Sequence, residues 1–179
     1  MLQLVKESII NIRTATIEDA KQIAFVHIDS WRTTYSGILT EEYLDKLNLQ
    51  EKTNYWIQLL TKQSDNVFVA VNQGEIVGFA SAGESREENG FDSEVYAIYV
   101  LQQHQQKNIG RLLMTKTAKY LQNCGYNSIY VWVLADNSSK QFYKRLGGEQ
   151  FDKKEIEING QQLIEIAYGW RELNKLITT

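Results

Sequence analysis

The chain has 179 residues, 43% of them hydrophobic and 23% charged, which is the composition of a globular protein able to bury a core. Its formal net charge of −3 disfavours a general nucleic-acid binder, because phosphate contacts need a basic face. No apolar run approaches the roughly 20 residues of a membrane span, so neither nucleic acid nor a membrane is expected as a partner.

Residues 1–179 are expected to form a single domain, because no proline-rich linker, low-complexity tract or long run of like charge divides the sequence. Residues 1–7 lack the basic segment and the long apolar run of a signal peptide. Cys124 is the single cysteine, which excludes an intrachain disulfide. Both observations predict a cytoplasmic protein.

The N-terminal third predicts one strand and three helices. The apolar run 8–14 is typical of a strand. Thr16 predicts a helix start, because its side chain can cap the helix and Asp19 lies near the positive end of the helix dipole. Two further helical segments follow, with apolar positions Tyr43, Leu44 and Leu47 after a start at Thr40, and then Tyr55, Trp56, Leu59 and Leu60.

Three strands are expected next. The runs 67–71 and 76–82 are apolar and rich in β-forming residues, and Asn72-Gln73-Gly74 between them predicts a hairpin turn. The polar, glycine-containing segment 84–92 predicts a loop. The run 94–101 predicts the third strand of this group.

A longer helix is predicted over 109–123, and its proposed apolar face comprises Leu112, Leu113, Tyr120 and Leu121. Gly125 stands where a left-handed stop is favoured. The run 128–134 is apolar at odd and even positions alike, as in a strand covered on both faces.

The C-terminal part predicts a short helix over 137–146 and then a hairpin. The strands 151–158 and 163–170 are joined by Asn159-Gly160, the favoured two-residue turn. Strands and helices in this order predict a mixed sheet flanked by helices.

The junction between the strand 94–101 and the helix 109–123 carries the first chemical signal. Free backbone N–H groups at a helix start point outward, and the helix dipole favours an anion there. Lys107 and Arg111 add positive charge at the same end. This segment alone is also compatible with an ordinary connection whose polar residues face solvent.

The segment Gln105-Gln106-Lys107-Asn108-Ile109-Gly110 resembles the pyrophosphate loop of the GNAT superfamily of acetyl-CoA-dependent N-acyltransferases, which usually reads Gln/Arg-x-x-Gly-x-Gly/Ala. Gln105 and Gly110 match this pattern. Asn108 replaces a glycine, but asparagine tolerates a positive φ better than most residues. Gln102 and Gln106 also differ from the proline and glycine that many relatives have.

A second segment, Asn137-Ser-Ser-Lys140-Gln-Phe142-Tyr143-Lys-Arg-Leu146-Gly147-Gly148, is similar to the family's Asn-x-x-Ala-x-x-Phe-Tyr-x-x-x-Gly-Phe. Lys140 replaces an alanine, and Gly148 replaces an aromatic residue. The stretch 30–39 also resembles a common bacterial subgroup, in the region where relatives line the acceptor pocket.

The resemblance implies a fold of the α/β (α+β) class. Its sheet is mixed, mostly antiparallel and of about seven strands, and it splays between strands four and five, with the pantetheine arm of acetyl-CoA in the gap. No metal is expected. The residues implied in cofactor binding are Ile98, Tyr99, Val100, Gln105, Gln106, Lys107, Asn108, Ile109, Gly110, Arg111, Asn137, Lys140, Tyr143 and Lys144.

The implied reaction is direct attack of a bound primary amine on the thioester, whose carbonyl an N–H near Ile98 would polarise. Tyr143 would act as general acid on the departing thiolate. The amine must lose a proton, and Glu94, eleven residues before Gln105, or a water chain would accept it. Residues implied in acceptor binding are Trp31, Tyr35, Glu94 and Tyr96.

Several alternatives stay open. The acceptor is a small amine, a polyamine or a peptide amine, and the chain could instead be a catalytically silent acetyl-CoA sensor or interaction module, as the replacement at Asn108 allows. A homodimer is one further expectation from the resemblance. His27 is expected to pack in a helix and His104 to lie solvated in the loop, and neither predicts a zinc site.

Overall fold

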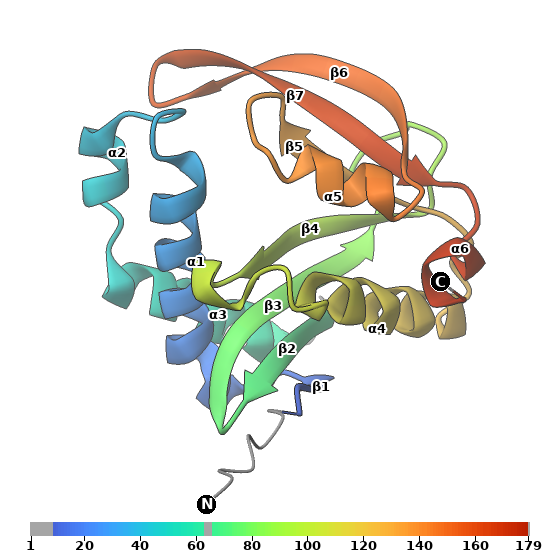
Figure 1. The fold of residues 1–179 in the computed structure, drawn as a ribbon, viewed down its shortest axis with the longest axis horizontal. Coiled ribbons are helices and arrows are strands. Elements are labelled where there is room, and N and C mark those ends of the chain that lie inside the picture. The colour runs from blue at the N-terminus through green and yellow to red at the C-terminus, as the bar shows by residue number, and fades with distance from the viewer. Residues whose placement is uncertain (1–8, 63–65, 179) are drawn as a thin grey trace, which may run out of the picture.

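The computed structural model of the chain describes residues 9–62 and 66–178. Two expectations fall outside the described residues, namely the start of the first strand at Ser8 and the lack of a signal peptide in residues 1–7. Within the described part, seven strands form one sheet in the order β1-β2-β3-β4-β5-β7-β6, with helices packed against it (Figure 1).

The strands are β1 (Asn11–Thr14), β2 (Asn66–Asn72), β3 (Glu75–Glu84), β4 (Ser93–Val100), β5 (Ile129–Leu134), β6 (Glu149–Ile158) and β7 (Gln161–Trp170). The helices are α1 (Ala20–Tyr35), α2 (Glu41–Asp45), α3 (Leu49–Lys62), α4 (Ile109–Asn123), α5 (Lys140–Arg145) and α6 (Asn174–Ile177), and two short 3-10 turns are η1 (Ile17–Asp19) and η2 (Gln102–His104). No helix in the described ranges has the length and apolar character needed to cross a bilayer.

Strands β4 and β5 run parallel but pair only near their N-terminal ends. The register joins residues 93–95 of β4 to residues 129–131 of β5, and beyond Val95 the two strands separate. The other neighbouring strands of the sheet are antiparallel. The predicted fold, a mixed and mostly antiparallel sheet that splays between the fourth and fifth strands, is therefore confirmed.

A β-bulge lies in β4 at the point of separation. The consecutive β3 residues Ala82 and Ser81 pair with Val95 and Ala97, so Tyr96 is the extra residue on β4. A bulge next to a functional site changes which face of the sheet the following side chains occupy. Side chains from both sides of this bulge reach the cavity described below.

The hydrophobic core has two parts. The first lies between α1, α3, α4 and the strands β2–β4, and its largest buried side chains include Trp56, Phe68 and Phe79. The second joins α4, α5 and β5 to β7 and α6 around Tyr168 and Trp170. Because α4 contributes to both parts of the core, burial of its inner face fixes the position of this helix, which follows β4 in the chain.

Helix α4 buries only part of the face that was expected. Leu113 and Leu121 are fully buried as predicted, whereas Leu112 and Tyr120 are 37% and 38% exposed. Successive residues of a helix are rotated by about 100° around its axis. Leu112 therefore lies at the margin of the buried face whose centre is near Leu113. The stop is confirmed, since Gly125 adopts φ +92° just after the helix.

The helix expected from Thr16 starts differently. The chain first forms η1 and becomes α-helical at Ala20. The Asp19 carboxylate accepts from the backbone N–H of Thr16 (2.8 Å) and from the Arg13 guanidinium (2.6 and 2.8 Å). This acidic residue therefore joins the helix start to β1.

Two other helices are shorter than predicted. Helix α2 ends before Leu47, which lies in the turn that leads to α3. Only α5 is helical within the predicted range 137–146. The Asn137 side-chain oxygen accepts from the N–H of Ser139 (2.8 Å), which forms a turn ahead of the helix.

Both predicted hairpins are confirmed. Asn159 and Gly160 have φ values of +49° and +79° between β6 and β7, as a type I′ turn requires, and Gln73 and Gly74 turn the chain between β2 and β3. Strand β6 forms one edge of the sheet. A homodimer through this edge stays a prediction.

Candidate active site

The separated part of β4 has an open edge that faces the gap. Ile98, Tyr99 and Val100 are half-buried there and pair with β3 on their other side. Backbone groups on a free strand edge can pair with an extended ligand. Gln105 closes the end of this edge, because its Nε2 donates to the Val100 carbonyl oxygen (3.0 Å).

The loop after β4 places a helix start beside this edge. Gln106 and Asn108 adopt φ values of +59° and +64°, so asparagine serves at the position where a glycine is usual. The first helical hydrogen bond runs from the N–H of Leu112 to the Asn108 carbonyl (3.1 Å). The N–H groups of residues 109–111 precede this bond and, with the helix dipole, can bind an anion.

Cations and close packing complete the helix start. Lys107 is exposed, its Nζ donating to the Gln103 carbonyl (2.9 Å), and Arg111 is half-buried in the first turn of α4. A β-carbon at Gly110 would lie 3.0 Å from Cζ of Phe142. The start of α4 therefore lies directly against α5.

Tyr143 on α5 is a buried phenol. It is 5% exposed, and its ring lies 6.2 Å from that of Tyr168 and 6.4 Å from that of Trp170. Burial raises the pKa of Tyr143, and the nearby Tyr35 adds to the rise, so the hydroxyl is protonated at neutral pH. Among the residues that the structure describes, none forms a hydrogen bond with it. A phenol that keeps its proton can donate a hydrogen bond.

Two departures from the family pattern have structural explanations. Lys140, which replaces an alanine, donates from Nζ to the Ala135 carbonyl (2.5 Å). A β-carbon at Gly148 would lie 2.7 Å from Cζ2 of Trp170, whose Nε1 donates to the Leu146 carbonyl (2.9 Å). The indole of Trp170 thus fills the place of the usual aromatic residue.

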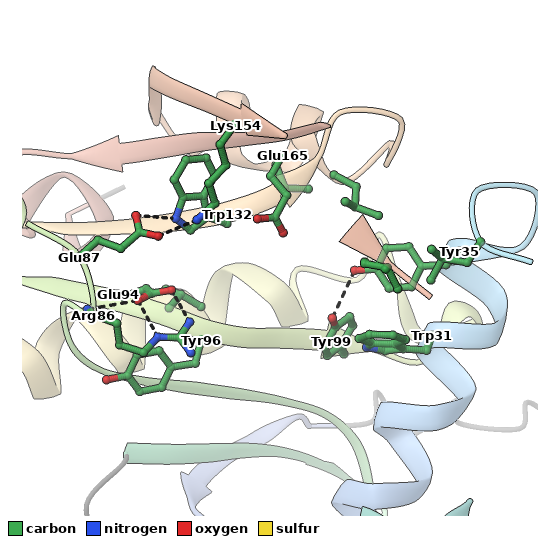
Figure 2. Close-up of a pocket in the computed structure, with 15 residues that line it drawn as sticks. Trp31, Tyr35, Arg86, Glu87, Glu94, Tyr96, Tyr99, Trp132, Lys154 and Glu165 are labelled. Carbon is green, nitrogen blue, oxygen red and sulfur yellow. Dashed lines mark hydrogen bonds and ion pairs between the residues drawn. The ribbon is translucent and has the colours of Figure 1, made fainter. Parts of the chain in front are cut away.

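A cavity of about 430 Å³ adjoins the gap (Figure 2). Its walls come from α1, the loop after β3 and the strands β4–β7. All four residues expected to contact the acceptor, Trp31, Tyr35, Glu94 and Tyr96, line it. Both aromatic rings and charged groups line this space, which suits an amine that carries positive charge on an apolar stem.

Glu94 is buried and firmly held. Its side chain is 3% exposed, and it accepts from Nε (2.9 Å) and Nη2 (2.5 Å) of Arg86 and from the Tyr130 hydroxyl (3.0 Å). The Arg86 guanidinium also lies over the Tyr96 ring, 4.6 Å from its centroid. Burial raises the pKa of Tyr130 to about 12, Glu94 adds to the rise and Ser85 opposes it, so the phenol stays a donor to Glu94.

Three tyrosines lie near one another at the other end of the cavity. The hydroxyls of Tyr35 and Tyr99 are 3.3 Å apart, as Figure 2 shows. Burial raises the pKa of Tyr99 well above its ordinary value, and Tyr35 and Tyr143 contribute to the rise. Buried Asn137 also lies close to Tyr35 and lowers the pKa of Tyr35, which opposes the larger effect of burial. Lys144, which the resemblance implies in cofactor binding, is exposed.

Five further lining residues with charged or aromatic side chains were missed from the sequence, namely Arg86, Glu87, Trp132, Lys154 and Glu165. The first two lie in a segment predicted only as a polar loop, and Trp132 lies in a strand predicted to be core. Glu165 gave a usable signal, because it is the single charge in the otherwise apolar run 163–170.

Both histidines are at least partly covered by the fold. Nδ1 of buried His27 accepts from Nε1 of Trp56 (3.3 Å), and burial lowers the pKa of His27 to about 3. His104 is half-buried in η2 rather than solvated, since its Nδ1 is covered. In the described ranges, no three His, Cys, Asp or Glu residues are grouped to hold a metal ion.

The model of the acetyltransferase (GNAT) family matches residues 27–148, more than half of the chain. The chain therefore belongs to this family and is an N-acetyltransferase. It is 41% identical over 171 residues to the uncharacterized N-acetyltransferase YuaI of Bacillus subtilis (strain 168), covering 94% of this chain and 97% of that one.

A curated relative and a solved structure, both from Thermoplasma acidophilum, are also similar. A spermidine N(1)-acetyltransferase is 26% identical over 144 residues, which cover 77% of this chain and 87% of the relative. The crystal structure of PaiA N-acetyltransferase in complex with coenzyme A superposes with a TM-score of 0.65 at 22% identity, covering 88% of this chain and 98% of that one. The second likeness supports the fold.

Proposed function

We propose that the chain transfers the acetyl group of acetyl-CoA to a cationic primary amine by direct attack. The observation that carries this proposal is the continuity of three features. These are the open strand edge at Ile98–Val100, the helix start at residues 109–111, which can bind an anion, and the buried phenol of Tyr143, which lies near Tyr99 of that edge. The charged cavity, which Tyr99 also lines, adjoins them.

The residues around the gap fit an acyl-coenzyme A. The edge of β4 would pair with the amides of the pantetheine arm, and the backbone from Gln106 to Arg111 would bind the diphosphate. Lys107, Lys140 and Lys144 would lie near phosphate. A solved structure of similar fold carries coenzyme A, which supports this assignment.

The cavity favours a positively charged acceptor. Its lining includes Glu87, Glu94 and Glu165 against the cations Arg86 and Lys154, so the carboxylates outnumber the cations. The aromatic walls would cover the methylene groups of an alkyl amine. A relative that is named for acetylation of spermidine supports a small amine or polyamine over a peptide.

In the proposed reaction, the N–H near Ile98 polarises the thioester carbonyl, and the amine attacks the carbonyl carbon. Tyr143 then donates its proton to the departing sulfur. Glu94 is the first candidate for the base, but its ion pair with Arg86 and its bond from Tyr130 occupy the carboxylate. These contacts favour a relay over direct proton transfer to Glu94.

The test is a thiol-release assay with acetyl-CoA and a panel of amines comprising spermidine, an aminoglycoside, an L-amino acid and a lysine peptide. Saturable release of coenzyme A with at least one amine supports the proposal. Calorimetric binding of acetyl-CoA without thiol release from any amine would instead identify a silent binder.

A further inference from the structure

One carboxylate in the cavity, that of Glu165, forms no hydrogen bond or close ion pair with the described residues. Glu165 lies on β7, directly opposite Lys154 of β6. Lys154 turns away from it, with Nζ 2.6 Å from a carboxylate oxygen of Glu87 and 3.9 Å from the centroid of the Trp132 ring. Of the residues that the structure describes, none donates a hydrogen bond to the Glu165 carboxylate.

The other two carboxylates of the cavity are engaged. Glu94 is held by Arg86 and Tyr130, and Glu87 is held by Lys154 and by Nε1 of Trp132 (3.1 Å). Figure 2 shows Glu165 projecting from the opposite wall into the space between the Arg86–Glu94 pair and the Tyr35–Tyr99 pair. A cationic ligand in this space would find Glu165 as its one uncommitted counter-charge among the described residues.

The strand register places Glu165 at the separated end of the sheet. It pairs with Leu134 of β5, three residues beyond Val131, the last β5 residue in register with β4. Because Tyr96 is an extra residue in β4, three register positions beyond Val95 reach Tyr99, the neighbour of Ile98, where the proposed function places the reacting carbonyl. Glu94 lies three register positions before Ile98, roughly 10 Å away along a strand.

The surroundings of Glu165 suit proton exchange with an amine. Burial raises the pKa of its carboxyl, Glu87 and Glu94 add to the rise, and Lys154 and Arg86 oppose it. Tyr35 faces it from α1, since the Glu165 charge raises the pKa of Tyr35 in addition to the larger effect of burial. A carboxylate that is more basic than usual is a better proton acceptor near neutral pH.

We propose that Glu165 binds the ammonium group of the acceptor and takes its proton before attack. This inference rests on the proposed acetyl transfer and adds the residue that activates the amine. The ligand class is an alkyl amine protonated at neutral pH, whose stem the rings of Trp31, Tyr35 and Trp132 would enclose.

The step balances as follows. One N–H bond of the ammonium breaks, and its proton passes to a carboxylate oxygen of Glu165, which leaves a neutral amine. The nitrogen lone pair forms the N–C bond while the C–S bond breaks. A second amine proton replaces the one that Tyr143 gives to the sulfur, and Glu165 returns its proton to solvent.

The experiment compares wild type with Glu165→Gln, using acetyl-CoA and spermidine across a range of pH. The matched control is Glu155→Gln, which removes the same charge from the exposed position next to Lys154 on β6. Calorimetry with acetyl-CoA and thermal unfolding verify that each variant is folded. Glu165→Asp, which keeps the carboxylate, tests partial rescue.

We expect kcat of Glu165→Gln near pH 7 to fall by about 10²–10⁴-fold, with acetyl-CoA affinity and the Glu155→Gln control unchanged. The wild-type kcat should rise with pH through the raised pKa of Glu165 and then level off. The kcat of Glu165→Gln should show no such plateau and should increase about tenfold per pH unit until the amine itself deprotonates near pH 10.

An unchanged kcat and pH profile in Glu165→Gln overturns the inference, and so does an equal loss at every pH, which would indicate a structural role. These results would leave the proposed function standing, because wild type still acetylates spermidine. A wild type that binds acetyl-CoA but releases no thiol with any amine of the panel refutes both.

Discussion

The replacement of Tyr143 by Phe separates catalysis from stability. The Tyr143 hydroxyl is buried and has no hydrogen bond to any described residue, so its removal costs no protein hydrogen bond, and the free energy of unfolding should change by less than about 1 kcal/mol. A general acid contributes about 10²–10⁴-fold to a rate. We therefore expect kcat to fall by at least about 100-fold, or about 3 kcal/mol in activation free energy.

The assay follows coenzyme A release with a thiol reagent, and calorimetry measures acetyl-CoA affinity, which should stay within about threefold of wild type. Because the pKa of Tyr143 is raised, its proton remains available up to about pH 10, so wild type should not lose activity to phenol ionisation below that pH. The matched control is Tyr168→Phe, which removes from the adjacent ring a buried hydroxyl that no described residue hydrogen-bonds, and it should leave kcat unchanged. Equal rates for Tyr143→Phe and wild type, or equal losses in both variants, would refute the reasoning.

Three other predictions concern the loop, the packing of α4 and a buried histidine. Asn108→Val should destabilise the fold by about 1–2 kcal/mol, because a branched side chain resists the φ of +64° at this position. It should also weaken acetyl-CoA binding, whereas Asn108→Gly should change neither property. Equal melting temperatures and affinities for Asn108→Val and wild type would contradict this. Gly110→Val should weaken acetyl-CoA binding in calorimetry, because a β-carbon there meets Phe142 at 3.0 Å. The second change Phe142→Leu should restore part of the lost affinity. No recovery of affinity in the double variant would argue against this contact as the cause. Burial lowers the pKa of His27 to about 3, below the unfolded value of about 6.5, so the unfolded state binds the extra proton and stability should fall by up to about 1.4 kcal/mol per pH unit below pH 6.5. The free energy of unfolding, measured by urea unfolding at several pH values, should fall less steeply with decreasing pH in His27→Gln than in wild type. The same pH dependence in both proteins would mean that His27 is not the titrating group.

Local signals in the sequence predicted much of the fold. The type I′ turn at Asn159-Gly160 and the stop at Gly125 depend on positive φ values that these residue types favour. The splay after Val95 followed from the resemblance to the GNAT superfamily rather than from any pattern in the strands. Helix boundaries were less predictable, because Asn137 starts a turn instead of a helix.

The candidate site was predicted only in part. The loop around Asn108 and the phenol of Tyr143 were found through motifs, which concern residues close together in sequence. The ion pair between Arg86 and Glu94 depends on how the loop after β3 folds back on β4. Glu165 reaches the cavity because β7 pairs with β5, and local sequence does not encode that contact.

The central claim is that the gap beyond Val95 holds the coenzyme with its sulfur at Tyr143. A crystal structure of the chain with bound coenzyme A tests it most directly. The account predicts that the pantetheine arm lies along the edge of β4 at Ile98–Val100, with the diphosphate on the N–H groups of residues 109–111 and the sulfur within hydrogen-bond distance of the Tyr143 hydroxyl. A coenzyme bound elsewhere on the chain, or one whose sulfur lies far from that hydroxyl, would contradict it.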